Sequence, residues 1–578
     1  MQLAGRLGTP ISVAACWSRW RTVPLLFGAV ALATVPIALA PARALASSSQ
    51  VSMIEDDTHL QADPAGTLER MRALGADVVR VSMPWQTIAP APRSGRAPRG
   101  FDASDPAAYP AANWTLWDTI VTDARRDGIT VDLDVMGGAP RWATGPGRPA
   151  RNINPNWEPS PAAFGEFVQA VATRYSGQYD PFRQAPAPGD PNDLPRVSFW
   201  SIWNEPNYGP SLAPQGVPGH LAVENSPRMY RRLLDAAWAA LRATGHAPAT
   251  DSILFGELAP RGADRWGVFS GMKPLAFLRA LYCVDAVYRP LRGTAAGIRG
   301  CPTTAAGARR FRAQHPALFA ATGVSDHPYM RWYPPNREQN PDPTNRSSTA
   351  DYASLALIGN LEHTLDRLQR SYQSRTRFPI FDTEFGYMTS PPKHSPDPLG
   401  KALFVSPAVA ALYTNWAEYM SWRDPRLESF AQYLLYDPLR PRASNDWGGY
   451  ASGLLSWNGI PKATYNAWRL PLWLPVTRAR VGQALPVWGC VRPAHFQAHD
   501  TGPVQNVAIQ FASRPSGPFT TIKTVTVGNS SSCYFDVPVT FPASGTVRLS
   551  FGDSLGDSLL VAAGQEIVSR SVQVALRK

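Results

Sequence analysis

The sequence is poor in the residues and motifs that mark several common classes of protein. Only five cysteines occur in 578 residues, and no two form a C-x-x-C pair, which excludes a zinc knuckle and a thioredoxin-like site. The nine histidines are scattered and form no H-E-x-x-H, and no acidic run has the spacing of a calcium loop. No glycine-rich phosphate loop follows the first predicted strand. We therefore expect neither a metal ion nor any other cofactor.

Dense blocks of lysine and arginine are absent as well. The formal net charge is +12, but Arg6, Arg19, Arg21 and Arg43 all precede Glu55, the first acidic residue. Without those four charges the chain carries +8, a modest excess for more than 500 residues. Such a chain could bind an anionic wall polymer, whereas no motif supports a nucleic-acid partner.

Long apolar runs are limited to the N-terminus. Arg19 and Arg21 precede an uncharged run from Val23 to Ala40, and Ala44-Leu45-Ala46 offers an A-x-A cleavage site. We read residues 1–46 as a signal peptide and expect a secreted or cell-surface protein. An uncleaved leader that anchors the chain in a membrane is the alternative. Because no other stretch could span a bilayer, we expect no membrane insertion of the mature chain.

The few cysteines agree with export. Cys16 lies in the leader, which leaves four in the mature chain, and four cysteines allow three pairings. The local choice pairs Cys283 with Cys301 and Cys490 with Cys533. Disulfides are typical of exported chains, and four unpaired thiols would be unusual outside a reducing cytosol.

The sequence is rich in short β-forming segments that alternate with amphipathic helical patterns. Eight strands are predicted, at 51–54, 78–83, 130–135, 197–203, 253–256, 324–327, 380–383 and 430–435. Helical periodicity lies between them, at 64–74, 114–126, 161–175, 227–243 and 352–372. This order predicts an α/β fold, a (β/α)8 TIM barrel over residues 47–474. A doubly wound open sheet is the alternative.

The composition changes after Leu474. Over residues 477–578, short alternating runs are broken by Gly, Ser, Asn and Pro, and no helix of useful length is predicted. The pattern predicts a smaller C-terminal β-sandwich of about 100 residues, the usual size of an immunoglobulin-like unit. Its role could be structural or carbohydrate-binding.

Two of the predicted barrel strands end in a glutamate. The fourth strand runs into Asn204-Glu205-Pro206, and the seventh delivers Glu384. Because the carboxyl ends of barrel strands form the catalytic face, these two side chains are expected to face each other across the barrel mouth. Two opposed carboxylates are what the cleavage of a glycosidic bond requires.

Neighbouring residues fit supporting roles in such a reaction. Asn204 could hold a sugar hydroxyl, and Arg80 could keep the nucleophile ionised by placing a positive charge beside it. Tyr329 could donate to the same carboxylate. Glu257, at the end of the fifth strand, is a candidate for substrate contact.

The glutamate motifs resemble those of clan A glycoside hydrolases, as in families 5 and 39. The resemblance rests on Asn204-Glu205-Pro206 and Thr383-Glu384-Phe385-Gly386, and it covers roughly residues 50–474. It implies a retaining mechanism, with Glu205 as the acid/base and Glu384 as the nucleophile. An arginine on strand two and a His-x-Tyr on strand six are frequent companions in the clan, and Arg80 and His327-Pro-Tyr329 match them.

The match departs from the clan at two strands. The clan often has a tryptophan at the end of strand eight, where this sequence offers Tyr436, and the first strand ends in an acidic cluster, Glu55-Asp56-Asp57. Both departures leave the sugar open.

Sugar sites usually include aromatic platforms. Trp85, Trp142, Trp332 and Tyr387 follow predicted strands closely enough to serve, although most tryptophans belong to the core. His327 could likewise be an ordinary hydrogen-bonded barrel residue.

The sequence therefore predicts a retaining glycoside hydrolase that cleaves an extracellular oligo- or polysaccharide as a monomer. A transglycosylase that remodels a cell-wall glycan is one alternative, because it would use the same two carboxylates. A non-catalytic carbohydrate-binding wall protein is another, because a fold alone does not establish an activity.

Overall fold

The computed structural model describes residue 47 and residues 50–148, 156–182, 192–338, 349–389, 404–438, 450–492, 505–527, 533–552 and 565–578. The leader predicted over residues 1–46 lies outside this set. No helix among the described residues is long and apolar enough to cross a membrane.

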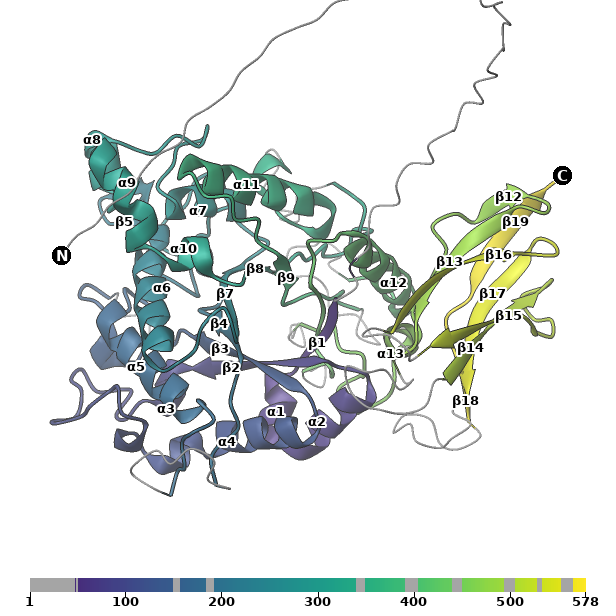
Figure 1. Ribbon diagram of the computed structural model, residues 1–578, viewed down its shortest axis with the longest axis horizontal. Coiled ribbons are helices and arrows are strands. Elements are labelled where there is room, and N and C mark those ends of the chain that lie inside the picture. The colour runs from purple at the N-terminus through teal and green to yellow at the C-terminus, as the bar shows by residue number, and fades with distance from the viewer. Residues whose placement is uncertain are drawn as a thin grey trace, which may run out of the picture. The chain divides into compact units, whose positions relative to one another are not determined.

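Eight parallel strands form a nearly closed sheet (Figure 1). They are β1 (Val51–Glu55), β2 (Val78–Pro84), β3 (Thr130–Met136), β4 (Phe199–Ile202), β7 (Ser252–Leu258), β8 (Gly323–Asp326), β9 (Ile380–Asp382) and β10 (Ser429–Tyr433). Hydrogen bonds join them in the order β10-β1-β2-β3-β4-β7-β8-β9. A parallel bridge between Ile380 and Leu427 brings β9 against the segment that enters β10, which closes the ring. The predicted (β/α)8 barrel is confirmed.

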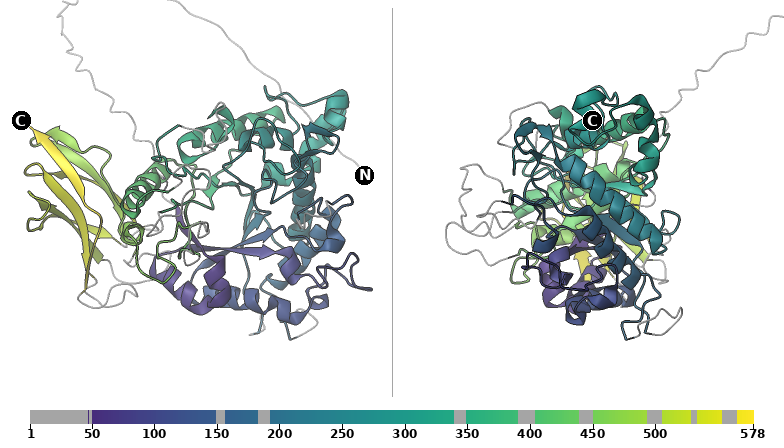
Figure 2. Two further views of the ribbon diagram at one scale, coloured as in Figure 1. Left: turned by 180° about the vertical axis from the view of Figure 1, so that it is seen from behind. Right: turned by 90° about the vertical axis from the view of Figure 1, so that its left-hand side faces the viewer.

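Helices surround the ring of strands (Figures 1 and 2). They are α1 (Asp57–Ala62), α2 (Pro64–Ala73), α3 (Trp85–Ile88), α4 (Ala111–Arg126), α5 (Pro161–Arg174), α6 (Ser226–Ala243), α7 (Pro274–Leu281), α8 (Gly293–Gly297), α9 (Ala305–Gln314), α10 (Ala317–Ala320), α11 (Ile358–Ser371), α12 (Pro407–Arg423) and α13 (Ala463–Arg469). All five predicted helices are present. The last begins later than predicted, because Leu355–Leu357 forms a separate 3₁₀ turn before α11. A short hairpin, β5 (Gly216–Val217) with β6 (His220–Glu224), lies between β4 and α6.

Local sequence signals explain where several helices begin. The Asp63 side chain accepts a hydrogen bond from the Gly66 amide at the start of α2, and Ser160 does the same for Ala163 in α5. Each capping residue is followed by a proline, whose fixed φ suits the first helical position and whose missing N–H is not needed there. The helices then cover the outer face of the sheet, so the strands are buried on both faces.

In the C-terminal region, the residues that the structure describes form strands and no helix. They are β11 (Leu472–Trp473), β12 (Arg478–Arg480), β13 (Ala484–Cys490), β14 (Gln505–Ala512), β15 (Thr520–Val527), β16 (Tyr534–Thr540), β17 (Gly545–Gly552), β18 (Glu566–Val568) and β19 (Val572–Arg577). One sheet has the order β11-β13-β16 and the other the order β12-β19-β17-β14-β15, with β18 paired to β17. Val487 from the first sheet and Ile509 and Leu549 from the second share one buried core. The predicted β domain is confirmed.

Both predicted disulfides are present. Cys283 pairs with Cys301 in the insertion that follows β7, and Cys490 pairs with Cys533 in the C-terminal region.

Candidate active site

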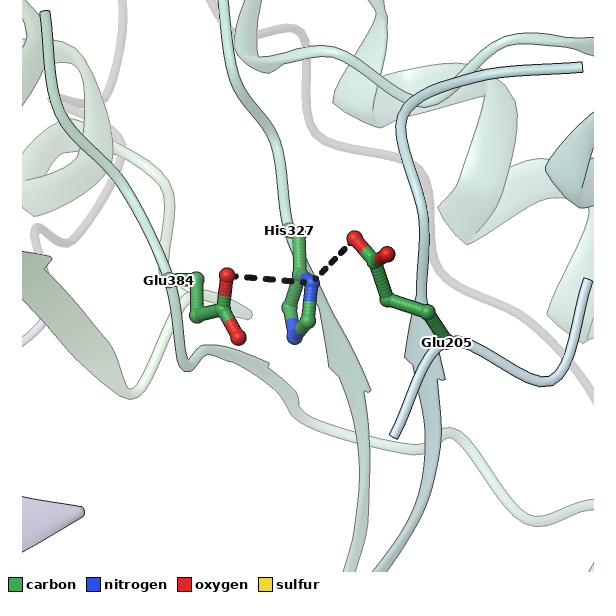
Figure 3. Close-up of side chains that lie close together, drawn as sticks. All are labelled: Glu205, His327 and Glu384. Carbon is green, nitrogen blue, oxygen red and sulfur yellow. Dashed lines mark hydrogen bonds and ion pairs between the residues drawn. The ribbon is translucent and has the colours of Figure 1, made fainter. Parts of the chain in front are cut away.

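Glu205 and Glu384 lie at the carboxyl ends of β4 and β9, which β7 and β8 separate in the sheet. Their carboxylates point toward each other on either side of the His327 ring (Figure 3). Glu384 is buried, whereas Glu205 is partly exposed. The arrangement places two carboxyl groups at one mouth of the barrel with different access to solvent.

His327 lies between the two glutamates. Its Nδ1 is 3.1 Å from Glu205 Oε1 and 3.5 Å from Glu384 Oε2, and its Nε2 is 2.9 Å from Glu257 Oε2. One ligand atom from each of Glu205, His327 and Glu384 can be chosen so that all three lie within 4.8 Å of one another. The two carboxyl groups are therefore close neighbours across the site.

Arg80 on β2 lies beneath the site and is fully buried. Its Nη1 donates to Glu384 Oε1 at 3.0 Å and to Glu55 Oε2 at 2.6 Å. Its Nη2 donates to Asp134 and to Glu257, each at 3.0 Å. A single guanidinium therefore joins acids from β1, β3 and β7 to the buried glutamate after β9.

The second oxygen of the Glu384 carboxylate also has a donor. The Tyr329 hydroxyl donates to Glu384 Oε2 at 3.1 Å. Burial raises the pKa of Tyr329 well above its ordinary value, so the hydroxyl keeps its proton and remains a donor. With Arg80 on one oxygen and Tyr329 on the other, the Glu384 carboxylate is held in one orientation.

The backbone that aims these side chains adopts uncommon conformations. Trp203 and Glu205 have φ of 67° and 46°, and Glu257 has φ of 43°. The Glu205 amide donates to the Glu257 carbonyl oxygen at 3.0 Å. Non-glycine residues in the left-handed region cost free energy and cluster at functional sites. The ends of β4 and β7 are thus held in a bent path that sequence propensity alone would not favour.

An irregularity in β7 explains the direction of Glu257. The pairing of β7 with β8 shifts register between Phe255 and Leu258. Gly256 has φ of 123°, and a Cβ there would lie 2.5 Å from the Ser325 carbonyl oxygen. Glycine is required at this turn, and the bulge directs the next side chain into the barrel.

The neighbours of His327 favour its protonated, positively charged form. Burial by itself lowers its pKa, but the charge of Glu384 and the hydrogen bonds to Glu205 and Glu257 raise the pKa well above 6.5. Both ring nitrogens are then donors. Burial likewise raises the pKa of Glu384 above its ordinary value, while His327 and Arg80 oppose that rise.

The remaining buried acids divide into two groups. Burial raises the pKa of Glu55 and of Asp134 well above the ordinary range. Burial would also raise the pKa of Glu257, but Arg80 and His327 hold it well below its ordinary value. Glu257 is therefore held in its ionised form as the counter-ion of His327, whereas burial favours the protonated forms of Glu55 and Asp134.

Glu205, His327 and Glu384 also have the spacing of metal ligands, the only such group in the described part of the chain. The charges at the site oppose this use. A protonated His327 has no lone pair to offer, and the Arg80 guanidinium lies 3.0 Å from Glu384. The expectation that no metal is needed remains a prediction.

A cavity of about 210 Å³ opens above the two glutamates. Its lining residues are Glu205, Tyr208, Pro260, Arg261, Tyr329, Arg331, Glu384, Met388, Tyr433 and Tyr450. Seven of these were not singled out by the sequence, namely Tyr208, Pro260, Arg261, Arg331, Met388, Tyr433 and Tyr450. Tyr433 had a signal, since it lies within the predicted eighth strand, whereas the others lie on loops with no pattern to select them.

Arg80, His327, Glu257 and Trp85 are fully buried. Arg80 places its positive charge beside Glu384, the role expected from the sequence, and His327 and Glu257 join it in the charged support beneath the carboxylates. Glu257 and Trp85, which were expected to contact a sugar, have no exposed surface in this structure. The ring of Trp85 packs among other aromatic side chains, which are Trp142, Phe164 and Phe167.

Two further aromatic residues lie away from the predicted position. Trp142 lines a different cavity, of about 390 Å³, together with Glu158 and Arg228. Tyr436 stacks on His59 with ring centroids 4.1 Å apart, because β10 already ends at Tyr433.

Asn204 is partly exposed beside Glu205, and its Oδ1 accepts from Arg80 Nη2 at 3.2 Å. Of the other two predicted platforms, Tyr387 is buried and Trp332 stays partly exposed next to the cavity residue Arg331.

No protein-family model matches the sequence, and a search of curated proteins likewise gives no match. Among solved structures, the chain is similar to a family 39 glycoside hydrolase from the gut symbiont Bacteroides cellulosilyticus WH2. The identity is 14% over 86% of this chain and 80% of that chain, with a TM-score of 0.44. It is also similar to GH5_18 from Streptomyces cattleya, at 14% identity over 76% of this chain and 85% of that chain, with a TM-score of 0.40.

A third similar structure is β-glucuronidase 2 of Bacteroides uniformis. The identity is 10% over 92% of this chain, which spans 45% of that protein, and the TM-score is 0.36. All three are glycoside hydrolases, but likenesses this distant assign no activity. The functional argument therefore rests on the geometry of the site.

Proposed function

We propose that this protein is a retaining glycoside hydrolase that cleaves an O-glycosidic bond by double displacement. Glu205 is the acid/base and Glu384 the nucleophile. The observation that carries the proposal is the opposed pair of carboxylates, with oxygens within 4.8 Å of each other at the mouth of the barrel.

The separation of the carboxylates favours the retaining mechanism. Retaining glycosidases place their two carboxyl groups roughly 5–5.5 Å apart, whereas inverting enzymes leave roughly 6.5–9.5 Å for a water molecule. An oxygen–oxygen distance within 4.8 Å belongs with the first group. The nucleophile must then attack the anomeric carbon directly.

The surroundings of the two carboxylates suit different tasks. Glu384 is buried, and both of its oxygens accept hydrogen bonds, from Arg80 and from Tyr329. These donors orient a carboxylate for attack. Glu205 is partly exposed. A group that protonates a leaving oxygen and later receives a proton from water needs this access to solvent.

The proposed reaction has two steps. In the first, Glu384 attacks the anomeric carbon while Glu205 protonates the departing oxygen, so the glycosidic bond breaks and a glycosyl ester forms. In the second, water attacks the same carbon as Glu205 takes its proton, and the ester bond to Glu384 breaks. In this proposal Asn204, partly exposed beside Glu205, holds a hydroxyl of the reacting sugar. Because the anomeric carbon is inverted twice, its configuration is retained.

The proposal is tested by Glu384→Ala with and without azide, on the full mature chain and an aryl glycoside or polysaccharide that the wild type cleaves. We expect kcat to fall by about 10³-fold or more. Azide should restore turnover by occupying the space of the lost carboxylate, and the product should be a glycosyl azide of inverted configuration.

The matched variant is Glu205→Ala. It keeps the nucleophile, so azide should intercept the glycosyl-enzyme and give the azide of retained configuration. Wild-type activity that survives in Glu384→Ala would refute the assignment, and azide products of one configuration from both variants would refute the division of roles. Activity that EDTA abolishes would point to a metal instead.

Two further parts of the proposal are the location of the substrate and the acceptor that attacks the glycosyl-enzyme. We propose an extracellular substrate, because the predicted leader and the two disulfides agree with export. Analysis of products distinguishes water from a second sugar as the acceptor, and longer glycans among the products would favour a transglycosylase. A chain that binds glycans but cleaves none would favour the non-catalytic alternative.

A further inference from the structure

The cavity above the catalytic glutamates has an uneven distribution of charge. Among the described residues that line it, Glu205 and Glu384 are the only acids, and both belong to the proposed chemistry. The other charged lining residues are two arginines, Arg261 and Arg331. Neither takes part in the reaction described above, so both are candidates for selecting the substrate.

The two arginines lie on the same side of the cavity. Arg261 follows β7 and Arg331 follows β8, and these strands are hydrogen-bonded neighbours in the barrel. Burial raises the pKa of the Tyr450 hydroxyl, and the positive charges of Arg331 and Arg261 both oppose that rise. Both guanidinium groups therefore act on one point of the cavity wall.

Arg261 is held near the acid/base. Its guanidinium carbon lies 5.7 Å from the centroid of the Tyr208 ring, and the Tyr208 amide donates to the Glu205 carbonyl oxygen at 2.9 Å. The Asn207 side chain donates to the Arg261 carbonyl oxygen at 3.3 Å and fixes the backbone. Within the described part of the chain, no ion pair includes the Arg261 side chain, although it borders a site of several acids.

Arg331 is fixed by the loop that carries Tyr329. It follows Tyr329 by two residues, and its backbone has φ of 59°, an uncommon conformation for a side chain of this size. Its guanidinium carbon lies 5.7 Å from the centroid of the Trp332 ring. The loop thus presents a donor to Glu384 and a cation to the cavity within three residues.

We propose that the substrate carries an anionic group, a carboxylate or an ester sulfate or phosphate on the glycan, and that Arg261 and Arg331 bind it. The inference rests on the glycosidase function proposed above. Arginine presents paired N–H donors that match the oxygens of a carboxylate, sulfate or phosphate. A neutral sugar would make no use of the charge of Arg261, whose side chain forms no ion pair in the described part of the chain.

Binding separates this inference from the catalytic proposal. The full chain carrying Glu384→Gln, which cannot turn over, is applied to an array of neutral, uronate-bearing, sulfated and phosphorylated glycans. Wild-type protein is assayed separately for hydrolysis of the glycans that the array retains. Retained glycans that the wild type does not cleave would refute the hydrolase and leave the anion site standing.

We expect the array to retain acidic glycans of one or more of these three classes and to release their neutral counterparts, including a carboxyl-reduced form of any uronate-bearing ligand. The class retained identifies the anion. Arg261→Gln and Arg331→Gln in the same background should each raise the Kd about tenfold, as expected for a charge-assisted contact. Rising salt should weaken binding because exposed charges are screened.

The controls lie in the same segment. Arg265→Gln removes an exposed arginine that does not line the cavity, and it should leave the Kd within about twofold. Arg261→Lys keeps the charge and should retain more affinity than Arg261→Gln. Retention of neutral glycans alone, no signal on any acidic glycan, or an unchanged Kd in both glutamine variants would overturn the proposal.

Discussion

At the scale of single residues, His327 is the point on which three carboxylates converge. Glu205 and Glu384 share its Nδ1 side, and Glu257 accepts from Nε2. Glu257 stays ionised beneath the ring, which favours the protonated form of His327. The ring can then donate through Nδ1 toward the two catalytic carboxylates. We infer that His327 orients the two catalytic carboxylates and places a positive charge between them. It does not contact the sugar.

This role predicts the pH dependence of the reaction. The nucleophile must be ionised to attack, and the pKa of Glu384 is raised by burial. The acid limb of kcat/KM should therefore lie above pH 4.5. His327→Gln removes a positive charge from beside Glu384, so the pKa of Glu384 should rise further and the acid limb should move to higher pH by about one unit or more.

The measurement is a pH–rate profile of each protein, with thermal unfolding to show that the variants are folded. The matched control is His315→Gln, which breaks a similar contact, His315 Nδ1 to Asp235 Oδ2 at 2.7 Å, outside the site. Its profile should match the wild type. An acid limb that stays in place or moves to lower pH in His327→Gln would contradict the charge assigned to His327.

The sequence allowed prediction of the two glutamates but not of the cavity around them. Glu205 and Glu384 end strands, and the position of a strand end follows from the pattern of apolar residues. Arg261 and Arg331 lie on loops whose direction depends on tertiary contacts, so no local pattern marks them. Trp85 was misjudged because burial in the core and exposure on a rim give the same signal after a strand.

At the scale of elements, the eight barrel strands were predictable because parallel strands buried on both faces read as short apolar runs. In the C-terminal region, β13 has no clear sequence signal, because Pro486 and Gly489 interrupt its alternation. The bulge in β7 was not foreseen either, although Gly256 in a strand is a known sign of one. The bulge that directs Glu257 beneath the site therefore has a single sequence signal, Gly256.

The two disulfides give a prediction for the segments that they join. Cys283–Cys301 closes 18 residues and Cys490–Cys533 closes 43 residues. Chain entropy in the unfolded state predicts a loss of about 3 kcal/mol for the first and about 4 kcal/mol for the second when both cysteines become serine. Denaturant unfolding of the two double variants measures these losses.

Activity at 25 °C supplies the control for the same variants. Neither disulfide contacts Glu205 or Glu384, so kcat/KM of the folded double-serine variants should stay within about twofold of the wild type. A larger loss in the free energy of unfolding for the shorter loop, Cys283–Cys301, would show that native contacts outweigh chain entropy at these bridges.

At the scale of the whole molecule, the described residues of the barrel and of the β domain belong to one compact unit. Arg492, just after β13, is fully buried in a pair with Glu418 of α12, with Nη2 to Oε1 at 2.6 Å. Its Nη1 donates to the Trp468 carbonyl oxygen, and its Nε donates to the Ser52 hydroxyl at 3.2 Å. One side chain of the β domain thus satisfies groups on three separate barrel elements.

This connection predicts how the molecule unfolds. Arg492→Met leaves Glu418 buried without its cation, which should lower the free energy of unfolding by about 3–5 kcal/mol. Arg492→Met combined with Glu418→Leu removes both charges and should recover much of that loss. Arg126→Met, which breaks an exposed pair with Asp123, should cost less than about 1 kcal/mol.

Denaturant unfolding followed by activity and by tryptophan fluorescence should give one coincident transition for the wild type, because the buried pair couples the two regions. A small loss for Arg492→Met, or separate transitions in the wild type, would show that the barrel and the β domain fold independently.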